Sequence, residues 1–267
     1  MTELRECLME RVIRLDHHQI LKPTPASDMT RLGNLKDGGY VISVSSIESA
    51  QILVSFGLGT NITFERDALI KNPNLDVKIF DHTVSKPTAF GLFRLLVASF
   101  LNGNTSLFKD GFSLLQTYKN KRIYHFRKRI VAQEKNYGEM SVSKVFQDIV
   151  SKPVFLKVDI EGDEFPILSD ILKVRKKLTG LVIEFHDSEK NYDEITRFVQ
   201  ILATDMRLVH FHGNNFSSIN RLGLPEVFEL SFISSKDFRE SNKELKLPLT
   251  FLDARNAPKR EDFEYEI

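Results

Sequence analysis

One stretch of the chain alternates apolar and polar residues in a way that predicts a strand, a turn, a helix and a second strand. An apolar run, typical of a buried strand, ends at Gly57 and Gly59. Helical spacing of apolar residues then starts at Asn61 or Thr63. A second apolar run ends directly before Asp81. This order of elements is half of a nucleotide-binding unit.

The same patterns predict alternating strands and helices along the rest of the chain. Strands are expected at 40–44, 52–56, 77–80, 129–133, 154–159, 180–185, 208–211 and 227–234, and helices at 3–15, 141–149 and 192–203. Strands that alternate with helices favour an α/β fold with a mostly parallel sheet. A loop, not a helix, precedes the last strand, so we expect an antiparallel hairpin to close the sheet.

Length and composition limit the number of domains and the class of protein. With 267 residues, 42% of them hydrophobic, the chain is expected to form one domain over 1–267. A helical N-terminal segment is expected at 1–29, and residues 84–122 form an insertion. The insertion is rich in Phe and Leu, and two interpretations stay open: a lid or acceptor-pocket wall, or a helix packed on the core.

Charge and cysteine content argue against several partners and locations. A net charge of +1 gives no overall field that would attract nucleic acid. The single cysteine, Cys7, excludes an internal disulfide, and the first residues lack the layout of a signal peptide. The longest apolar run, 89–101, is too short to span a bilayer. We therefore expect a cytoplasmic protein, and the sequence leaves its oligomeric state open.

The two glycines and the acid predict a site for an adenosine cofactor. Glycines at a strand end allow the backbone to approach a ligand closely, and an acid at the next strand end accepts hydrogen bonds from ribose hydroxyls. Ile62 stands where a dinucleotide-binding motif needs its third glycine, and the chain has no P-loop. A compact ligand without phosphates, such as S-adenosylmethionine, is therefore favoured over a dinucleotide.

Three further strand ends carry polar side chains that should converge on this site. Asp159 follows one strand, His186 and Asp187 follow the next, and His212 ends the third. His186 is the first candidate for a base that removes a hydroxyl proton. Alternatively, Asp159, Asp187 and a histidine could hold a divalent cation. We expect at most one of the two neighbouring histidines, His210 and His212, to face the site, and we select His212 as a candidate catalytic residue.

Several of these segments together resemble the FkbM-type S-adenosylmethionine-dependent methyltransferases. The resemblance extends over about residues 30–235, and the segment KVDIEG is its most specific part. The segments are DGGYV (37–41), SFGLG (55–59), FE (64–65), FD (80–81), KVDIEG (157–162) and EFH (184–186). The resemblance implies a class I methyltransferase fold, which is Rossmann-like and has a seven-stranded, mostly parallel sheet with a terminal antiparallel hairpin.

The resemblance also assigns roles to individual residues. Gly57, Gly59 and Asp81 would hold the cofactor, and Asp159 would face the reacting centre. Other residues would lie beside the cofactor or border the pocket: Asn61, Glu65, Gly38, Gly39 and Tyr40. On spacing alone the DGG segment reads as a surface hairpin, so the resemblance changes that interpretation.

The implied activity is O-methylation of a hydroxyl on a sugar, glycan or related small molecule. Two alternatives are a nicotinamide-dependent oxidoreductase and a non-catalytic carbohydrate-binding protein with a degenerate cofactor pocket. The insertion at 84–122 matches no general motif of the family, so the acceptor is not defined by the resemblance.

Overall fold

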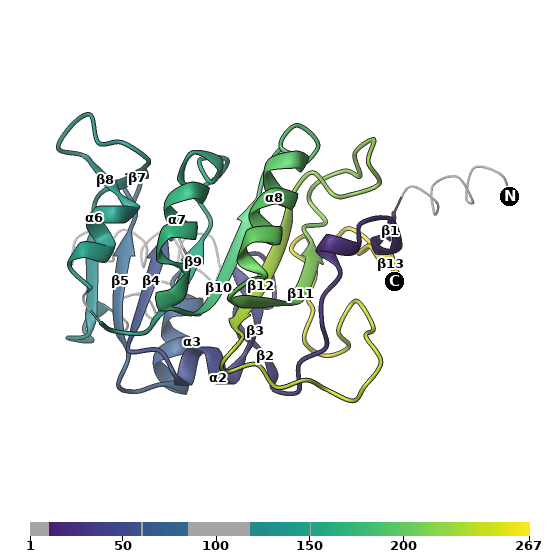
Figure 1. Ribbon diagram of the computed structural model, residues 1–267, viewed down its shortest axis with the longest axis horizontal. Coiled ribbons are helices and arrows are strands. Elements are labelled where there is room, and N and C mark those ends of the chain that lie inside the picture. The colour runs from purple at the N-terminus through teal and green to yellow at the C-terminus, as the bar shows by residue number, and fades with distance from the viewer. Residues whose placement is uncertain (1–10, 60, 85–117, 150) are drawn as a thin grey trace, which may run out of the picture.

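The computed structural model describes residues 11–59, 61–84, 118–149 and 151–267. Its centre is a seven-stranded sheet with the strand order β11-β12-β10-β9-β4-β5-β6 (Figure 1). The strands are Ile52–Phe56 (β4), Asp76–Phe80 (β5), Ile123–Phe126 (β6), Val154–Val158 (β9), Leu178–Phe185 (β10), Met206–Gly213 (β11) and Phe228–Ser234 (β12).

The sheet is mixed in the way the sequence predicts. Strands β6, β5, β4, β9 and β10 run parallel to one another, whereas β12 is antiparallel to both β10 and β11. Phe56 is in register with Phe80 on one side and with Val158 on the other. The three strands therefore end at the same level, which brings the residues that follow them to one edge of the sheet. The predicted α/β fold with a terminal antiparallel hairpin is confirmed.

Two hydrophobic layers cover the two faces of the sheet. Helices α6 (Val142–Gln147), α7 (Leu168–Val174) and α8 (Tyr192–Leu202) lie on one face (Figure 1). Helices α2 (Val44–Glu48) and α3 (Thr63–Lys71) and the hairpin of β2 (Met29–Gly33) and β3 (Gly39–Ser43) contribute to the other layer. Side chains alternate along each strand, so Val54 packs in the first layer and Leu53 in the second.

Short 3-10 helices connect several of these elements. They are Leu15–His17 (η1), Gln19–Leu21 (η2), Phe165–Ile167 (η3) and Arg175–Lys177 (η4). Ser141 caps the start of α6, because its side-chain oxygen accepts a hydrogen bond from the backbone N–H of Lys144. In the described part of the chain, no helix has the length and apolar character needed to cross a membrane.

The strand predicted at 129–133 does not belong to the central sheet. Arg129–Val131 (β7) pairs with Glu139–Ser141 (β8) in a separate two-stranded sheet. The position beside β5 is taken by β6, which directly follows the insertion and was not predicted as a strand. Only Ile123 of β6 is buried, so this edge strand lacks the continuous apolar run that marks the central strands.

The predicted N-terminal helix is wrong over the residues that the structure describes. Val12–Arg14 forms strand β1, which pairs in parallel with Glu264–Glu266 (β13) at the C-terminal end of the chain. Ile13 and Leu15 are both fully buried, which is the alternation of a strand. Its partner lies at the other end of the chain, so local periodicity could not identify it. The remainder of that helix, 3–10, lies outside the described residues, as do 85–117 of the insertion.

Candidate active site

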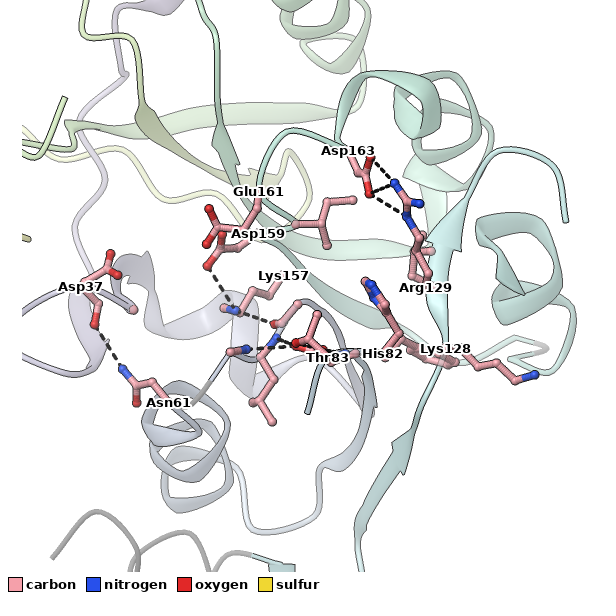
Figure 2. A pocket seen from close by; sticks show the side chains of 18 residues that line it. Asp37, Asn61, His82, Thr83, Lys128, Arg129, Lys157, Asp159, Glu161 and Asp163 are labelled. Atoms are coloured by element: carbon pink, nitrogen blue, oxygen red, sulfur yellow. Dashed lines mark hydrogen bonds and ion pairs between the residues drawn. The ribbon is translucent and has the colours of Figure 1, made fainter. Parts of the chain in front are cut away.

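The carboxyl ends of β4, β5 and β9 border a cavity of about 750 Å³ (Figure 2). This edge of a parallel sheet is where α/β proteins bind ligands, and the volume suits a cofactor-sized molecule. Six residues proposed from the sequence line the cavity: Gly38, Gly57, Gly59, Asn61, Asp81 and Asp159. Of the three further strand ends expected to converge on the glycine turn, only the one that carries Asp159 contributes to the cavity wall.

Gly57 permits a very close approach between two strand ends. Its φ is 81°, and a Cβ at this position would stand 1.6 Å from the backbone oxygen of Asp159. Gly59 has a φ of 56°, but a Cβ there would meet no described atom within 4 Å. Only glycine fits at position 57, whereas at position 59 the missing side chain leaves the backbone open toward the cavity.

Asp81 holds the glycine loop in place. Its Oδ2 accepts hydrogen bonds from the backbone N–H groups of Leu58 (2.8 Å) and Gly59 (3.0 Å), and its Oδ1 accepts from the N–H and hydroxyl of Thr83 (2.7 and 2.6 Å). Burial opposes ionisation, but these bonds outweigh it and lower the pKa of Asp81 below its usual value. The acid therefore lies on the cavity wall as a carboxylate, with both oxygens already engaged by the chain.

The β2–β3 hairpin reaches the cavity through the segment that contains two glycines. Gly39 pairs with Gly33 in the hairpin, and Gly38 lines the cavity, so this segment is both a hairpin and a part of the cavity wall. The amide nitrogen of Asn61 donates to the backbone oxygen of Asp37 (3.1 Å), and its oxygen accepts from the N–H of Thr63 (3.0 Å). Asn61 thus connects the hairpin to the start of α3.

Tyr40, Lys157 and Asp159 form a polar group at the cavity wall, in which Lys157 and Asp159 line the cavity and Tyr40 is buried. The Tyr40 hydroxyl donates to Oδ2 of Asp159 (2.8 Å), and Nζ of Lys157 lies 3.9 Å from the same oxygen. Nζ of Lys157 also donates to the backbone oxygen of Gly57 (2.9 Å). Burial, together with the nearby charge of Asp159, raises the pKa of Tyr40 well above its usual value, so the hydroxyl keeps its proton.

Glu65 is not part of the cavity wall; it lies in the protein interior, next to strand β4. Its side chain is fully buried in α3, where Oε1 accepts a hydrogen bond from the Ser55 hydroxyl (2.6 Å). Its Oε2 has no hydrogen-bond partner in the described residues. Burial raises the pKa of Glu65, and the charge of Lys157 only partly opposes that shift.

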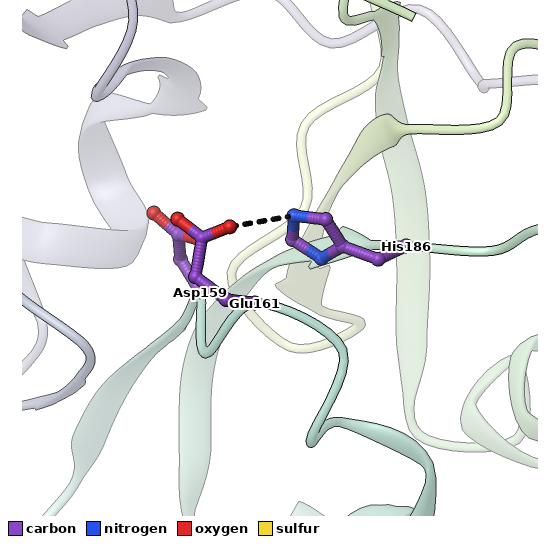
Figure 3. Close-up of side chains that lie close together, drawn as sticks. All are labelled: Asp159, Glu161 and His186. Carbon is purple, nitrogen blue, oxygen red and sulfur yellow. Dashed lines mark ion pairs between the residues drawn. The ribbon is translucent and has the colours of Figure 1, made fainter.

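His186 lies beside two acids that follow β9. Its Nδ1 is 3.1 Å from Oε1 of the fully buried Glu164, and its Nε2 is 3.5 Å from Oε2 of Glu161 (Figure 3). Burial lowers the pKa of His186, but the hydrogen bond to Glu164 and the charges of Glu164 and Asp159 outweigh it. The resulting pKa of His186 is above the ordinary value of 6.5.

His212 lies away from the cavity, in a buried polar row across the sheet. Glu184 on β10 is opposite Glu229 on β12, which is opposite His212 on β11. Nδ1 of His212 is 3.7 Å from Oε2 of Glu229, and both side chains are almost fully buried. Although burial disfavours the charged ring, this carboxylate raises the pKa of His212 to about 9. The structure therefore places His212 in an internal ion pair and not with the other candidates.

At most one of the two neighbouring histidines was expected to face the site, and neither His210 nor His212 lines the cavity. The rings of His210 and His212 stack with centroids 6.2 Å apart. Residues two apart on a strand share a face, because side chains alternate with a period of two. Nε2 of His210 lies 3.0 Å from Oδ1 of Asp253, so both rings have carboxylate partners inside the protein.

Asp187 does not join the proposed metal ligands. It is exposed, has a φ of 49°, and borders a different surface hollow with Glu189 and Arg221. Glu161 takes the place expected for Asp187: ligand atoms of Asp159, Glu161 and His186 all lie within 4.8 Å of one another. The left-handed φ of 56° at Glu161 was not readable from the sequence.

Three site residues were missed by sequence reasoning: Lys157, Glu161 and Glu164. Lys157 had a recognisable signal, since it is a lysine inside the otherwise apolar strand β9, where it is 4% exposed. Glu161 and Glu164 stood in the acidic segment after β9, but their contacts with His186 depend on the neighbouring strand.

The strand order and the glycine loop facing an acid define a class I methyltransferase architecture. The family model described as "Methyltransferase FkbM domain" matches residues 36–211. The chain therefore belongs to the FkbM methyltransferase family, and membership implies S-adenosylmethionine as the methyl donor.

Solved structures and curated proteins add little to this assignment. A precorrin-6y C5,15-methyltransferase from Geobacter metallireducens is similar at 12% identity and a TM-score of 0.37, over 72% of this chain and 86% of that chain. A putative O-methyltransferase from Klebsiella pneumoniae is similar at 10% identity and a TM-score of 0.35, over 70% and 74%. A comparison with curated proteins finds no match.

The residues around the cavity fit S-adenosylmethionine. The backbone at Gly59 is open, Asp81 is an ionised acid on the same wall, and the cavity can hold a ligand of this size. Figure 2 shows Asp37, Asp159 and Glu161 on one side of the cavity and His82, Lys128 and Arg129 on the other. The acidic side suits a cationic sulfonium better than an anionic group.

Proposed function

We propose that the protein is an O-methyltransferase that methylates a hydroxyl of a sugar, glycan or related small molecule. The observation that supports this most is the position of His186 beside Asp159 and Glu161, two acids of the cavity wall. An imidazole and two carboxylates offer proton acceptors next to the expected methyl donor. A hydroxyl needs such help because its own pKa is far above neutral.

The chain's residues would position the acceptor and remove its proton. S-adenosylmethionine, when bound, supplies an electrophilic methyl group and a neutral thioether leaving group. Oε1 of Glu164 accepts from Nδ1–H of His186 and so directs Nε2 toward Glu161. Nε2 of His186 would accept the hydroxyl proton while the acceptor oxygen takes the methyl group, and the electron pair of the C–S bond would remain on the sulfur of the donor. Most of the rate enhancement would come from positioning.

The charge distribution supports a neutral, hydroxyl-rich acceptor. Asp37, Asp159 and Glu161 would repel an anionic acceptor, and carboxylates accept hydrogen bonds from sugar hydroxyls. The balance of 37 basic and 36 acidic residues offers no general attraction for nucleic acid. A small-molecule or glycan acceptor in the cytoplasm remains our proposal, and membership in a methyltransferase family favours it over the oxidoreductase and the non-catalytic alternatives.

Labelled methyl transfer tests this proposal. The protein is incubated with isotopically labelled S-adenosylmethionine and separate panels of sugars, amines and thiols, and products are analysed by mass spectrometry. We expect label on oxygen of a polyol, and a loss of about 100-fold in turnover for His186→Gln. Asp187→Asn is the matched control and should retain turnover. Label found only on nitrogen or sulfur would contradict the proposal.

A melting-temperature comparison separates the two cofactor classes. S-adenosylhomocysteine should raise the melting temperature and NADH should not, because only a ligand that binds the folded state stabilises it. Stabilisation by NADH alone would support the oxidoreductase alternative.

A further inference from the structure

We propose that Asp159, Glu161 and His186 bind a divalent metal cation at the acidic side of the cavity. The three side chains follow the neighbouring parallel strands β9 and β10. Each offers one ligand atom, and these atoms lie within 4.8 Å of one another (Figure 3). Ligands of one cation, bonded at about 2 Å each, lie at most about 4 Å apart, so a small adjustment of the side chains brings the three atoms to coordinating distance.

The orientation of the His186 ring is fixed by a carboxylate, as is usual for histidines that bind metal ions. Ligating histidines usually donate their other ring N–H to a carboxylate, which fixes the tautomer. Here Nδ1 is 3.1 Å from Oε1 of Glu164, and the Glu164 side chain is fully buried. Glu164 is itself fixed, because the same oxygen accepts from the backbone N–H of Gly162 (3.1 Å). Nε2 is thereby left to face Glu161, at 3.5 Å from its Oε2.

The carboxylates around His186 outnumber the basic side chains that pair with them in the described part of the chain. Within the described residues, the only ion pair of Glu161 is the one with His186, and its side chain is 88% exposed. Lys157 is 3.9 Å from Asp159, but its Nζ also donates to the backbone oxygen of Gly57. Glu164 adds a buried carboxylate whose Oε2 has no partner among the described residues. A divalent cation would compensate this excess.

The ligand types select the class of cation. Two carboxylates with one imidazole suit a first-row divalent ion such as Mn²⁺, which accepts both oxygen and nitrogen ligands. Three protein ligands leave coordination positions for water or for an acceptor oxygen. If the proposed function is correct, the cation would bind the acceptor hydroxyl and lower its pKa, and it would replace the His186 imidazole as the group that aids deprotonation, because a coordinated Nε2 cannot accept a proton.

Direct Mn²⁺ binding tests the inference without requiring activity. Chelator-treated protein, free of methyl donor and acceptor, is titrated with Mn²⁺ and the free ion is measured by electron paramagnetic resonance. We expect one Mn²⁺ per chain, and at least tenfold weaker binding for Glu161→Gln and for His186→Gln. Asp187→Asn removes the neighbouring exposed acid and should bind like the wild type, as should Asp163→Asn, whose carboxylate pairs with Arg129.

The outcomes separate this inference from the proposed function. Absence of Mn²⁺ binding, or equal affinity in wild type and Glu161→Gln, would overturn the metal site. O-methyl transfer that continues undiminished after chelation would contradict a role for the cation in the reaction, and would leave His186 as the base. Metal binding with the expected variant pattern, in a protein that transfers no methyl group to hydroxyls, would support the site and contradict the proposed function.

Discussion

Replacement of Gly57 by alanine should strongly destabilise the strand ends that form the cavity. The new Cβ would stand 1.6 Å from the backbone oxygen of Asp159, whereas such contacts essentially never fall below 3.0 Å. The backbone of β4 or β9 must move, although Asp159 N–H donates to Phe56 O at 2.9 Å and resists that movement. Overpacking costs about 1–3 kcal/mol, and the left-handed backbone of a non-glycine residue adds about 1 kcal/mol.

The predicted loss of unfolding free energy for Gly57→Ala is therefore about 3 kcal/mol. Gly59→Ala is the matched control, because its Cβ meets no described atom within 4 Å and only the backbone strain of about 1 kcal/mol applies. Urea denaturation followed by circular dichroism gives both values. Equal stability of the two variants would refute the reasoning, since the difference between them comes only from the contact with Asp159.

Three further predictions concern the buried polar groups. Tyr40→Phe removes the 2.8 Å bond to Asp159 and should lower stability by about 1 kcal/mol and reduce turnover; unchanged turnover would show that this bond does not position the acid. Lys157→Met should lower the free energy of unfolding, measured by urea denaturation, by about 3 kcal/mol, because the Gly57 oxygen loses its hydrogen-bond donor and Glu65 loses the nearby positive charge. Adding Glu65→Gln in a double variant should recover part of that loss. The pKa of His212 is about 9 in the folded protein against 6.5 ordinarily, so its stabilising charge is fully present below pH 6.5 and is lost as the pH rises to about 9. The stability difference between wild type and His212→Gln should therefore shrink by about 1–3 kcal/mol between pH 6 and pH 9.5, and a constant difference would contradict the ion pair.

The parts of the fold that were predictable are those specified by local patterns. The buried run of β4, the glycines after it and Asp81 after β5 lie within one continuous stretch, and each has its expected place at the cavity. The final hairpin was recognisable because a loop, not a helix, precedes β12. Such features need no knowledge of distant partners.

The parts that sequence reasoning missed depend on contacts between distant segments. Strand β1 forms by pairing with β13. Because β13 lies about 250 residues later in the chain, no local pattern of apolar residues indicates that pairing. His212 was placed in the site although its partner Glu229 holds it in the sheet interior. The choice of Asp187 over Glu161 failed for a different reason, since the backbone conformation of each residue decides where its carboxylate points.

The central claim is that the loop at Gly57 to Gly59 and the acid Asp81 form the binding site of the methyl donor. Calorimetric titration with S-adenosylhomocysteine tests this claim most directly, with Asp81→Ala as the variant and Asp76→Ala, at the opposite end of β5, as the control. We predict one site per chain in the wild type, at least tenfold weaker binding in Asp81→Ala and unchanged binding in Asp76→Ala. Equal affinity in all three proteins, or no binding by the wild type, would contradict the account.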